Sequence, residues 1–505
     1  MDTDMPVKKQ NKVKKFIKEN KVNIYIFLAM LIFTIIICSN FLNMHFSQDT
    51  YSLYSSGWDA YIKHFLLSNR IFSALELWIS KVFNISFEMT ILISSIVSMI
   101  VFSLTWFILY KSIVKMIKKE HDKWQNLLII GITFSIIFNF CTFETMVFAE
   151  ASVMSISILL AVIAACLYTE QKYIKSFITL TISTFCYQTA ASLFLVLTLV
   201  FIAYKHKGNI KEIVKKSIGV FFFWGITMII NLVMTKLFSS YFGMTTRQTT
   251  ILSIDQIIST IVHYGKYLLL ENLEIGPKGW YLVFIIILSV IFIVSIIKNK
   301  KYFHIFEYIV LVLLSFIVPT LPLTVMPIES QYIEARMAMC FGAILGVILL
   351  YLVIVMKAIE IRGWNKIIYI LTACIFMINT IYFIRASSEN MATVYLDRNL
   401  AKSVLQAINK YEETTGNTVD TIGITWDKNP TTYYDGQLKL RSTNARGMVT
   451  DFSVIQALEY YGGKNYNAIY QVPDNIKSYF EQYDWDFFSE EQLLFEDNNL
   501  WLCLY

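Results

Sequence analysis

Long apolar runs separated by short polar segments fill the first three quarters of the chain. Runs of about 18 residues or more are long enough to cross a hydrocarbon core about 30 Å thick. The pattern therefore predicts an all-α polytopic membrane domain over residues 22–386, with about eleven transmembrane helices and a C-terminal α/β domain after it. The predicted spans are 22–42, 88–110, 126–143, 146–168, 175–187, 189–204, 217–238, 279–297, 304–321, 336–357 and 366–385.

The apolar segment 175–204 is open to two interpretations, one long helix or a hairpin of two short helices. Basic residues flank it on both sides, with Lys172 and Lys175 near its start and the sequence KHKGNIKEIVKK after its end. A single crossing would put one of these basic segments on the outer side of the membrane, against the usual distribution of Lys and Arg. We therefore expect a hairpin that turns near Tyr187 and Gln188.

The pattern changes in the last quarter of the chain, where the apolar runs shorten. Periodicity predicts an amphipathic helix over 395–413 and a short strand over 419–426. A second helix is predicted over 453–463, and residues 492–505 fit two strands around an Asp-Asn-Asn turn. We therefore predict a small α/β domain at 387–505, which is long enough for a hydrophobic core of its own.

Lys and Arg are unevenly distributed between the polar segments. The polar segments on one side of the membrane, which include the basic N-terminus 1–21, hold 25 Lys and Arg residues. The loops on the other side, 43–87, 239–278 and 322–336, hold 7. The positive-inside rule places the first group in the cytoplasm. With eleven spans, the N-terminus then lies on the cytoplasmic side of a cell membrane and the domain 387–505 lies on its outer side.

Composition narrows the class of protein further. Mean hydropathy is +0.54 and only 16% of the residues are charged, against about 25% in soluble domains. The sequence has no basic groove interleaved with aromatic residues, so we expect the lipid bilayer as a partner and no nucleic acid. The seven cysteines show no zinc-ligand spacing, and six lie in or beside apolar runs, as small buried hydrophobes do.

The first outer loop, 43–87, carries the residues most suggestive of chemistry. Asp49 and Arg70 follow directly after the first span, and Asp59 lies between them. Apolar and aromatic residues recur at helical spacing from Trp58 to Trp78, which predicts a helix along the outer interface. Such a helix would hold Asp49 at the mouth of a cavity and direct Arg70 toward a lipid phosphate.

Further polar residues are predicted at the outer ends of later spans. Ionisable groups at membrane depth are costly and tend to mark pathways or sites. Since all of these residues fall on the same side, we expect them to line one substrate cavity. They are Glu144 and Glu150 between the third and fourth spans, Tyr187 and Gln188 at the hairpin turn, and Glu329, Gln331, Tyr332, Glu334 and Arg336 before the tenth span.

These features resemble the Gtr-type (type II) polytopic glucosyltransferases and, more broadly, the GT-C class of membrane glycosyltransferases. The resemblance rests on SQDTY at 47–51, SNRIFSAL at 68–75 and CYQTAASLFL at 186–195. The layout also fits, with a multispan core whose N-terminus is inside and a short outer C-terminal domain. The resemblance covers the membrane part, and residues 20–205 carry it best.

The resemblance implies transfer of a sugar, expected to be glucose, from a polyprenyl-phosphate donor to a cell-envelope glycan on the outer face. Asp49 matches the loop acid and would act as the general base, with Arg70 or Arg336 binding the donor phosphate. Tyr187 and Gln188 match a membrane Tyr-Gln pair of the family and are assigned to the substrate cavity. Inverting displacement needs one base, whereas glycosidases normally use two carboxylates.

The chain departs from the family in two places. It has Gln48-Asp49 where the family often has a paired acid, and Asn69-Arg70 where a Gly-Arg pair is often found. A single carboxylate is a poor cage for a hard cation, so no metal or other cofactor is expected. Asp59 is the alternative candidate for the base.

Two other functions stay open. A transporter or flippase of lipid-linked sugars is disfavoured because the sequence shows no internal repeat and no matching pair of broken helices. A glycan polymerase or ligase is kept open by the long outer loop 239–278, which carries Arg247, His263, Lys266 and Glu271. The C-terminal domain lacks any recognisable catalytic pattern, so we expect it to act as a lid or to bind the acceptor.

Overall fold

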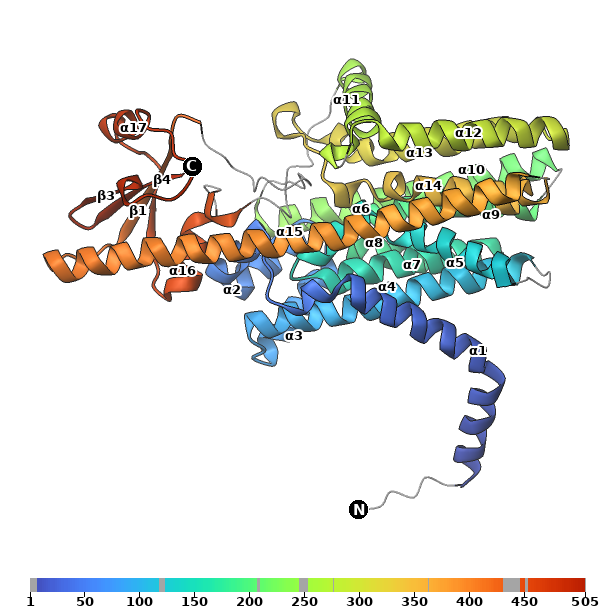
Figure 1. Cartoon of the computed structure of the whole chain (residues 1–505), viewed down its shortest axis with the longest axis horizontal. Coiled ribbons are helices and arrows are strands. Elements are labelled where there is room, and N and C mark those ends of the chain that lie inside the picture. Colours follow the sequence, from blue (N-terminus) through green and yellow to red (C-terminus); the bar gives the residue numbers. More distant parts are fainter. Residues whose placement is uncertain are drawn as a thin grey trace.

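The computed structural model shows a bundle of long helices with a smaller domain at one end (Figure 1). The first six residues of the predicted cytoplasmic N-terminus, and Arg247 of the loop 239–278, lie outside the described residues. The structure describes residues 7–117, 123–206, 209–244, 253–275, 277–361, 363–429, 446–449 and 453–504, with side chains from residue 21 onward.

Helices dominate the described residues. The long helices of the bundle are α1 (Val7–Ile37), α4 (Phe87–Ile117), α5 (Lys123–Ile137), α7 (Ala151–Thr169), α8 (Tyr173–Cys186), α9 (Ala191–Lys205), α10 (Ile210–Phe242), α12 (Trp280–Asn299), α13 (His304–Thr320), α14 (Met339–Ile354) and α15 (Trp364–Thr415). The other helical elements are α2 (Gln48–Leu67), α3 (Ile71–Val82), α6 (Phe140–Phe143), α11 (Ile254–Lys266) and the π-turn η4 (Tyr267–Glu271). The 3₁₀ turns are η1 (Ser39–Leu42), η2 (Glu144–Val147), η3 (Gln188–Ala190), η5 (Asn272–Glu274), η6 (Leu321–Val325), η7 (Ile328–Ser330), η8 (Ala335–Met337), η9 (Ala358–Glu360), η10 (Gly447–Val449) and η11 (Glu490–Gln492).

The bundle contains helices of membrane-spanning length and composition. Among the described residues seven helices are long and apolar enough to cross a membrane, and the bent pair Lys123–Ile137 and Phe140–Val147 would count as an eighth span. Lys21–Ile37 and Met339–Ile354 are shorter apolar helices. Because α14 is buried along its whole length, its apolar surface is covered by protein. The structure therefore agrees with a polytopic helical membrane protein, while the number of eleven spans stays a prediction.

The segment 175–204 folds back on itself, as the flanking charges predict. Helix α8 ends at Cys186, the backbone of Tyr187 is extended, and η3 and α9 then run back. The Nζ of Lys205 at the end of α9 donates to the main-chain oxygen of Thr169, 2.5 Å away, just before α8 begins. The two ends of the segment therefore lie side by side at the end of α7.

A sharp break separates α5 from α6, and its two helical parts are bent by 52°. The side chain of Asn139 caps the new turn, because its Oδ1 accepts hydrogen bonds from the main-chain N–H groups of Cys141 (3.0 Å) and Thr142 (3.2 Å). Gly342 of α14 packs directly against this cap. The break brings the next residues, Glu144–Val147, against η8 and the start of α7.

Replacing Gly342 by alanine is expected to destabilise the protein by about 1–3 kcal/mol, the usual range for overpacking a core. The added Cβ would lie 2.1 Å from Asn139 Oδ1 and 2.7 Å from Cys141 Cβ, so the cap would have to move. Thermal unfolding of the purified protein in detergent measures the effect. Gly225→Ala is the matched control, because its Cβ would meet no atom within 4 Å. Equal melting temperatures for the two variants would contradict this account of the break.

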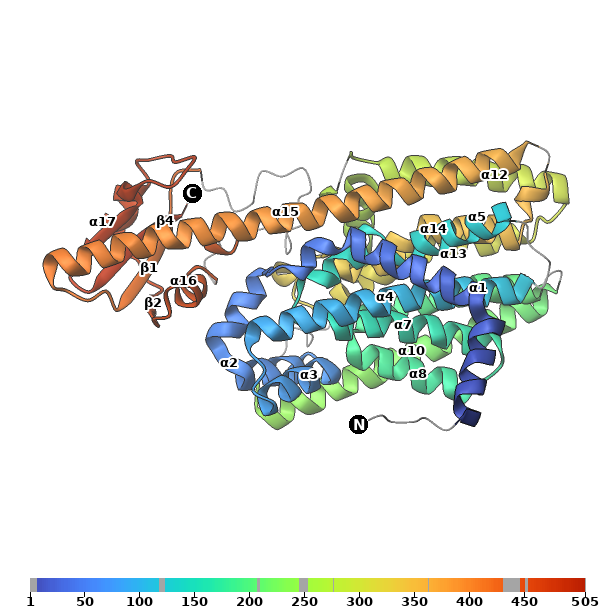
Figure 2. The same ribbon diagram turned by 60° about the horizontal axis from the view of Figure 1, so that its bottom comes forward.

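The first outer loop is more helical than predicted. We expected a polar loop around Asp49 followed by one interfacial helix from Trp58 to Trp78, but α2 already begins at Gln48 and α3 follows as a separate helix. Ser47 and Thr50 form a capping box that starts α2, and this helix start was not predicted from the sequence. Asp49 therefore sits in the first turn of a helix. Figure 2 shows α2 and α3 at the end of the bundle nearest the C-terminal domain.

The C-terminal domain is built on a four-stranded sheet in the order β2-β1-β4-β3. Strand β1 pairs in parallel with β2 and β4, and β3 pairs antiparallel with β4. The strands β1, β3 and β4 and the helix α16 agree with the predicted α/β domain, whereas β2 and α17 were not predicted. The elements are β1 (Thr421–Trp426), α16 (Val454–Gly462), β2 (Asn467–Ile469), α17 (Asp474–Phe480), β3 (Leu493–Glu496) and β4 (Asn499–Leu504).

Helix α15 joins the bundle to the C-terminal domain without interruption. Its 52 residues would extend over about 78 Å, more than twice the thickness of the hydrocarbon core. The boundary predicted at residue 387 falls inside this helix. Figure 1 shows α15 running along the bundle and then beneath the sheet.

The domain is fastened to α15 and to α2 by buried polar contacts. Asp397 of α15 accepts hydrogen bonds from the main-chain N–H groups of Gly447 (2.6 Å) and Met448 (3.2 Å), and Arg446 Nε lies 3.3 Å from the same carboxylate. The hydroxyl of Tyr461 lies 3.1 Å from that of Tyr51 in α2. The helix that carries Asp49 therefore packs against the C-terminal domain.

Candidate functional site

A cavity of about 470 Å³ opens along α2 at the end of the bundle nearest the C-terminal domain. One face of α2 forms most of its wall, at the three- and four-residue spacing of a helix. Arg70, the segment before α7 and Met244 complete it. The lining residues are Ser47, Asp49, Thr50, Ser52, Leu53, Ser56, Ala60, Tyr61, Lys63, His64, Phe65, Leu67, Arg70, Phe148, Ala149, Glu150 and Met244.

Asp49 is the acid at the N-terminal end of this wall, and its side chain is exposed. Its backbone is held in place from one side, because the hydroxyl of Tyr61 donates to the main-chain oxygen of Asp49 at 2.5 Å. Between them the helix is kinked at Gly57, whose φ of 74° and ψ of 170° lie in a region that essentially only glycine adopts. The kink and the hydrogen bond together set the direction of the first turns of α2.

Arg70 and Glu150 form the polar floor of the cavity. Arg70 Nη1 lies 3.4 Å from Glu150 Oε1, and the guanidinium lies 4.9 Å from the centre of the Tyr187 ring. Burial raises the pKa of Glu150, and the neighbouring Arg70 opposes this rise. The Nε of Arg70 is buried with no hydrogen-bond partner among the described residues. The side chain of Arg70 is 22% exposed and lines the cavity, so part of its guanidinium faces the space that a ligand would fill.

Arg336, the other predicted phosphate ligand, is fully engaged by Glu144. Its main-chain N–H donates to Glu144 Oε2 at 2.6 Å and its Nη1 lies 2.9 Å from Glu144 Oε1. The guanidinium also stacks on the ring of Phe148, with 4.5 Å to its centre. Phe148 lines the cavity and Arg336 does not, so the pair of Arg336 and Glu144 lies behind the cavity wall.

The remaining predicted residues fall in different places. Gln188 Nε2 donates to the main-chain oxygen of Ser68 at 2.6 Å, which fixes the connection between α2 and α3. Gln331 is engaged elsewhere, since Tyr264 of α11 donates to its main-chain oxygen at 2.8 Å. Asp59 points away from the cavity and pairs with Lys81, 2.6 Å away. The structure thus brings Asp49, Arg70, Glu150 and Tyr187 together, with Glu144 and Arg336 behind them.

Several residues of the cavity wall were not assigned to the site from the sequence, and three of them carry polar groups after the kink. Tyr61, Lys63 and His64 all lie on the part of α2 after its kink. The helical spacing from Asp49 through Ser56 to Lys63 was a signal that could have found them, had the helix been predicted to begin at Gln48. Lys63 adds a second cation to the cavity, beside Arg70.

A further acid, the half-buried Glu76 of α3, lies close to Glu150. The hydroxyl of Ser152, two residues after Glu150, donates to Glu76 Oε1 at 2.5 Å. Burial raises the pKa of Glu76 to about 7, and the nearby Glu150 adds to the rise while the Ser152 hydrogen bond opposes it. Glu76 is therefore protonated in part near neutral pH in the folded protein.

This shift predicts a pH-dependent contribution to stability. Between the ordinary pKa of about 4.5 and the folded value of about 7, the folded state binds a proton that the unfolded state has released. Stability is therefore expected to fall as the pH rises through this range. Glu76→Gln should remove that part of the pH dependence. Thermal unfolding in detergent from pH 4.5 to 8 measures it, and parallel profiles for the wild type and the variant would contradict the assignment.

Metal binding has no ready-made site in the described part of the chain, where no three His, Cys, Asp or Glu side chains lie close enough to hold one ion.

Comparison of the chain with family models, with curated proteins and with solved structures finds no match. The chemistry of the site therefore rests on its own geometry. It combines one exposed carboxylate, two cations and a buried acid around a cavity large enough for a small polar group.

Proposed function

We propose that this protein is a membrane glycosyltransferase that moves a sugar, glucose in the first instance, from a polyprenyl-phosphate donor to a cell-envelope glycan. One observation carries the proposal: Asp49 and Arg70, a base and a cation, line the same cavity. Transfer from a phosphate-linked sugar needs a base at the acceptor hydroxyl, on one side of the anomeric carbon, and a cation at the phosphate that leaves from the other side. The resemblance to Gtr-type glucosyltransferases in the first outer loop supports the same chemistry.

The proposed reaction takes place on the outer face. Lys115, Glu170 and Lys205 lie together at one end of the bundle, where Lys115 Nζ is 2.9 Å from Glu170 Oε1. Helix α2, whose side chains line the cavity, and the C-terminal domain lie at the other end (Figure 2). The excess of Lys and Arg at the first end supports a cytoplasmic location for it. We therefore propose that the cavity opens outside, beside the headgroups of the outer leaflet.

In the proposed mechanism Asp49 takes the proton from a hydroxyl group of the acceptor. The acceptor oxygen attacks the anomeric carbon of the donor sugar and forms the new glycosidic bond, with inversion. The bond between that carbon and the phosphate oxygen breaks, and the polyprenyl phosphate leaves with the electron pair. Arg70 stabilises the charge of this leaving group, because a charged guanidinium in a partly dry site is an effective donor to phosphate.

Of the two arginines predicted to bind phosphate, the geometry favours Arg70. The guanidinium of Arg336 is taken up by Glu144 and lies behind the wall, whereas Arg70 lines the cavity and keeps its Nε free of hydrogen bonds to the described residues. Lys63, on the same wall, is placed to assist as a second point charge. We assign Arg336 and Glu144 to holding the wall of the site.

Transfer by the purified protein tests the proposal. The protein is reconstituted in vesicles that carry polyprenyl-phosphate glucose with a radioactive sugar, and cell-envelope glycan is added outside. Radioactivity that moves into the glycan supports a glycosyltransferase. If no label is transferred but the lipid-linked sugar crosses between leaflets, the protein is a flippase and the proposal is wrong. Label that appears in lengthened chains of repeat units instead would favour a polymerase.

A further inference from the structure

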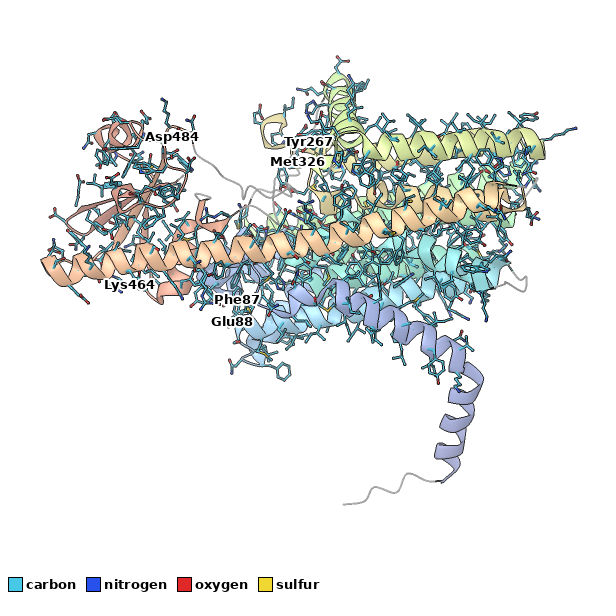
Figure 3. The ribbon with its side chains drawn as sticks, in the orientation of Figure 1. Phe87, Glu88, Tyr267, Met326, Lys464 and Asp484 are labelled. Carbon is cyan, nitrogen blue, oxygen red and sulfur yellow. The ribbon has the colours of Figure 1, made fainter. Side chains whose placement is uncertain are left out.

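A second cavity, of about 590 Å³, lies where the helical bundle meets the C-terminal domain. Its wall combines the segment before α2 with the first turns of α2, the start of α4, the part of α15 beyond the bundle, and α16. Figure 3 shows Glu88 and its neighbour Phe87 at this junction. The lining residues are Asn43, Met44, Phe46, Tyr54, Glu88, Met391, Val394, Tyr395, Arg398, Tyr460 and Tyr461.

Aromatic rings form much of this second cavity and are held rigidly. The ring of Tyr460 meets that of Tyr54 edge to face, with 4.9 Å between their centres, and that of Phe46 at 5.0 Å. Tyr54 is nevertheless 40% exposed, and Tyr395 on α15 is 64% exposed. Both rings offer a ligand apolar contact area, and the packing of Tyr54 against Tyr460 lowers the side-chain entropy that binding to it would cost.

Charged groups of both signs, and an amide, lie among the aromatic rings of this cavity. Glu88 Oε1 accepts a hydrogen bond from the Tyr460 hydroxyl at 3.3 Å, which leaves its other oxygen available as an acceptor. Arg398 lies exposed on the α15 side of the cavity and supplies donors, and Asn43 supplies both donors and an acceptor. Ring surfaces beside paired donors and acceptors suit a ligand with apolar C–H faces and many hydroxyl groups, which describes a saccharide.

The second cavity lies outside the apolar part of the bundle. The residues of α15 that line it, Met391 to Arg398, follow the ion pair of Arg385 with Glu389, in which Arg385 Nε is 3.1 Å from Glu389 Oε1. Charged residues at this point of α15 mark the end of its apolar stretch. The cavity is therefore placed to take a water-soluble ligand and not a lipid tail.

The two cavities are separated only by the first turns of α2. Ser47 and Leu53 line the first cavity, whereas their neighbours Phe46 and Tyr54 line the second. A helix with its side chains is about 10–12 Å across. An extended oligosaccharide lying in the second cavity therefore has a short path to Asp49.

We propose that this second cavity binds an uncharged segment of the acceptor glycan and thereby holds its reacting hydroxyl near Asp49. The assignment of this saccharide as the acceptor rests on the proposed glycosyltransferase function. Tyr54 and Tyr395 contact the faces of the sugar rings, and Glu88 and Arg398 bind their hydroxyl groups. The C-terminal domain then takes part in recognition of the acceptor, because α16 supplies Tyr460 and Tyr461.

Binding to a printed array of neutral oligosaccharides, two to eight sugars long, tests the proposal. The full-length protein is held in fluorescent lipid nanodiscs, and the wild type is expected to bind at least one of these saccharides. Glu88→Gln and Arg398→Gln should each weaken this binding about tenfold or more, because each loses a hydrogen bond to a charged group. Lys402→Gln is the matched control. Lys402 lies one helical turn after Arg398 on α15 and does not line the cavity, so the substitution removes a positive charge without changing the cavity.

The outcomes separate this site from the proposed catalysis. Asp49→Asn is expected to keep the saccharide binding while it loses transfer, and in transfer assays Glu88→Gln should raise KM for the acceptor with little change in kcat. No binding of any array saccharide by the wild type, or binding that both cavity variants retain in full, would overturn the inference. Binding that depends on Glu88 in a protein that transfers no sugar would keep the saccharide site and reject the transferase.

Discussion

Asp49→Asn is expected to lower sugar transfer by about 10²–10⁴-fold, the usual contribution of a positioned general base. The amide keeps the size of the carboxylate but cannot take the proton from the acceptor hydroxyl. Since Asp49 is exposed in the first turn of α2, the variant should fold as the wild type does. Transfer of labelled glucose from polyprenyl-phosphate glucose measures the loss, with far-UV circular dichroism as the check on folding.

Asp59→Asn is the matched control for this substitution. Asp59 lies on the same helix, but its side chain is 81% exposed and pairs with Lys81 away from the cavity. We expect transfer close to that of the wild type. If Asp49→Asn keeps full activity and Asp59→Asn loses it, the base has been assigned to the wrong acid.

The second large effect concerns the wall of the site. Glu144→Gln is expected to destabilise the protein by about 3–5 kcal/mol, because it removes the carboxylate that pairs with the buried guanidinium of Arg336. The side chain of Glu144 is fully buried and that of Arg336 is only 12% exposed. Thermal unfolding in detergent, with ligand-free protein at one pH, measures the loss.

A double variant separates loss of the charge pair from general disruption of the core. Glu144→Gln combined with Arg336→Met removes both charges of the pair, so it should be more stable than Glu144→Gln alone. Glu360→Gln is a control, since its pair with Lys357 is about half exposed on both sides and contributes little. A double variant less stable than the single one would show that the pair does not act through its charges.

Local patterns predicted much of this protein. Apolar runs identified the helical bundle, and the basic residues on both sides of 175–204 identified the turn at Tyr187. In the C-terminal domain, period-two alternation found β1, β3 and β4. The strand β2 was missed because its three residues, Asn467–Ile469, are too short to show any alternation.

The long helix α15 shows where composition misleads. The apolar segment before Arg385 and the amphipathic segment after Tyr395 were predicted as separate helices in separate domains. Yet the residues between them include neither proline nor glycine, and the helix begins after Gly363 and ends before Gly416. A change from apolar to polar residues alters the environment of a helix but does not end it.

The candidate site was predicted in part. Asp49, Arg70 and Glu150 were expected to share one cavity, and the structure places them around one. Gln331 and Asp59 were expected there as well, but tertiary contacts that no local pattern encodes hold them elsewhere. The second cavity could not be predicted, because its wall comes from four segments that are far apart in the sequence.

The continuity of α15 also fixes the orientation of the C-terminal domain. Each residue inserted into an α-helix turns everything after it by about 100° and advances it by about 1.5 Å. One extra residue between Arg385 and Asp397 would therefore swing the sheet and α16 around the bundle and carry Tyr461 away from Tyr51. The spacing along this stretch of helix acts as a rotational register, and the alignment of the domain with α2 depends on the number of residues there as well as on their identity.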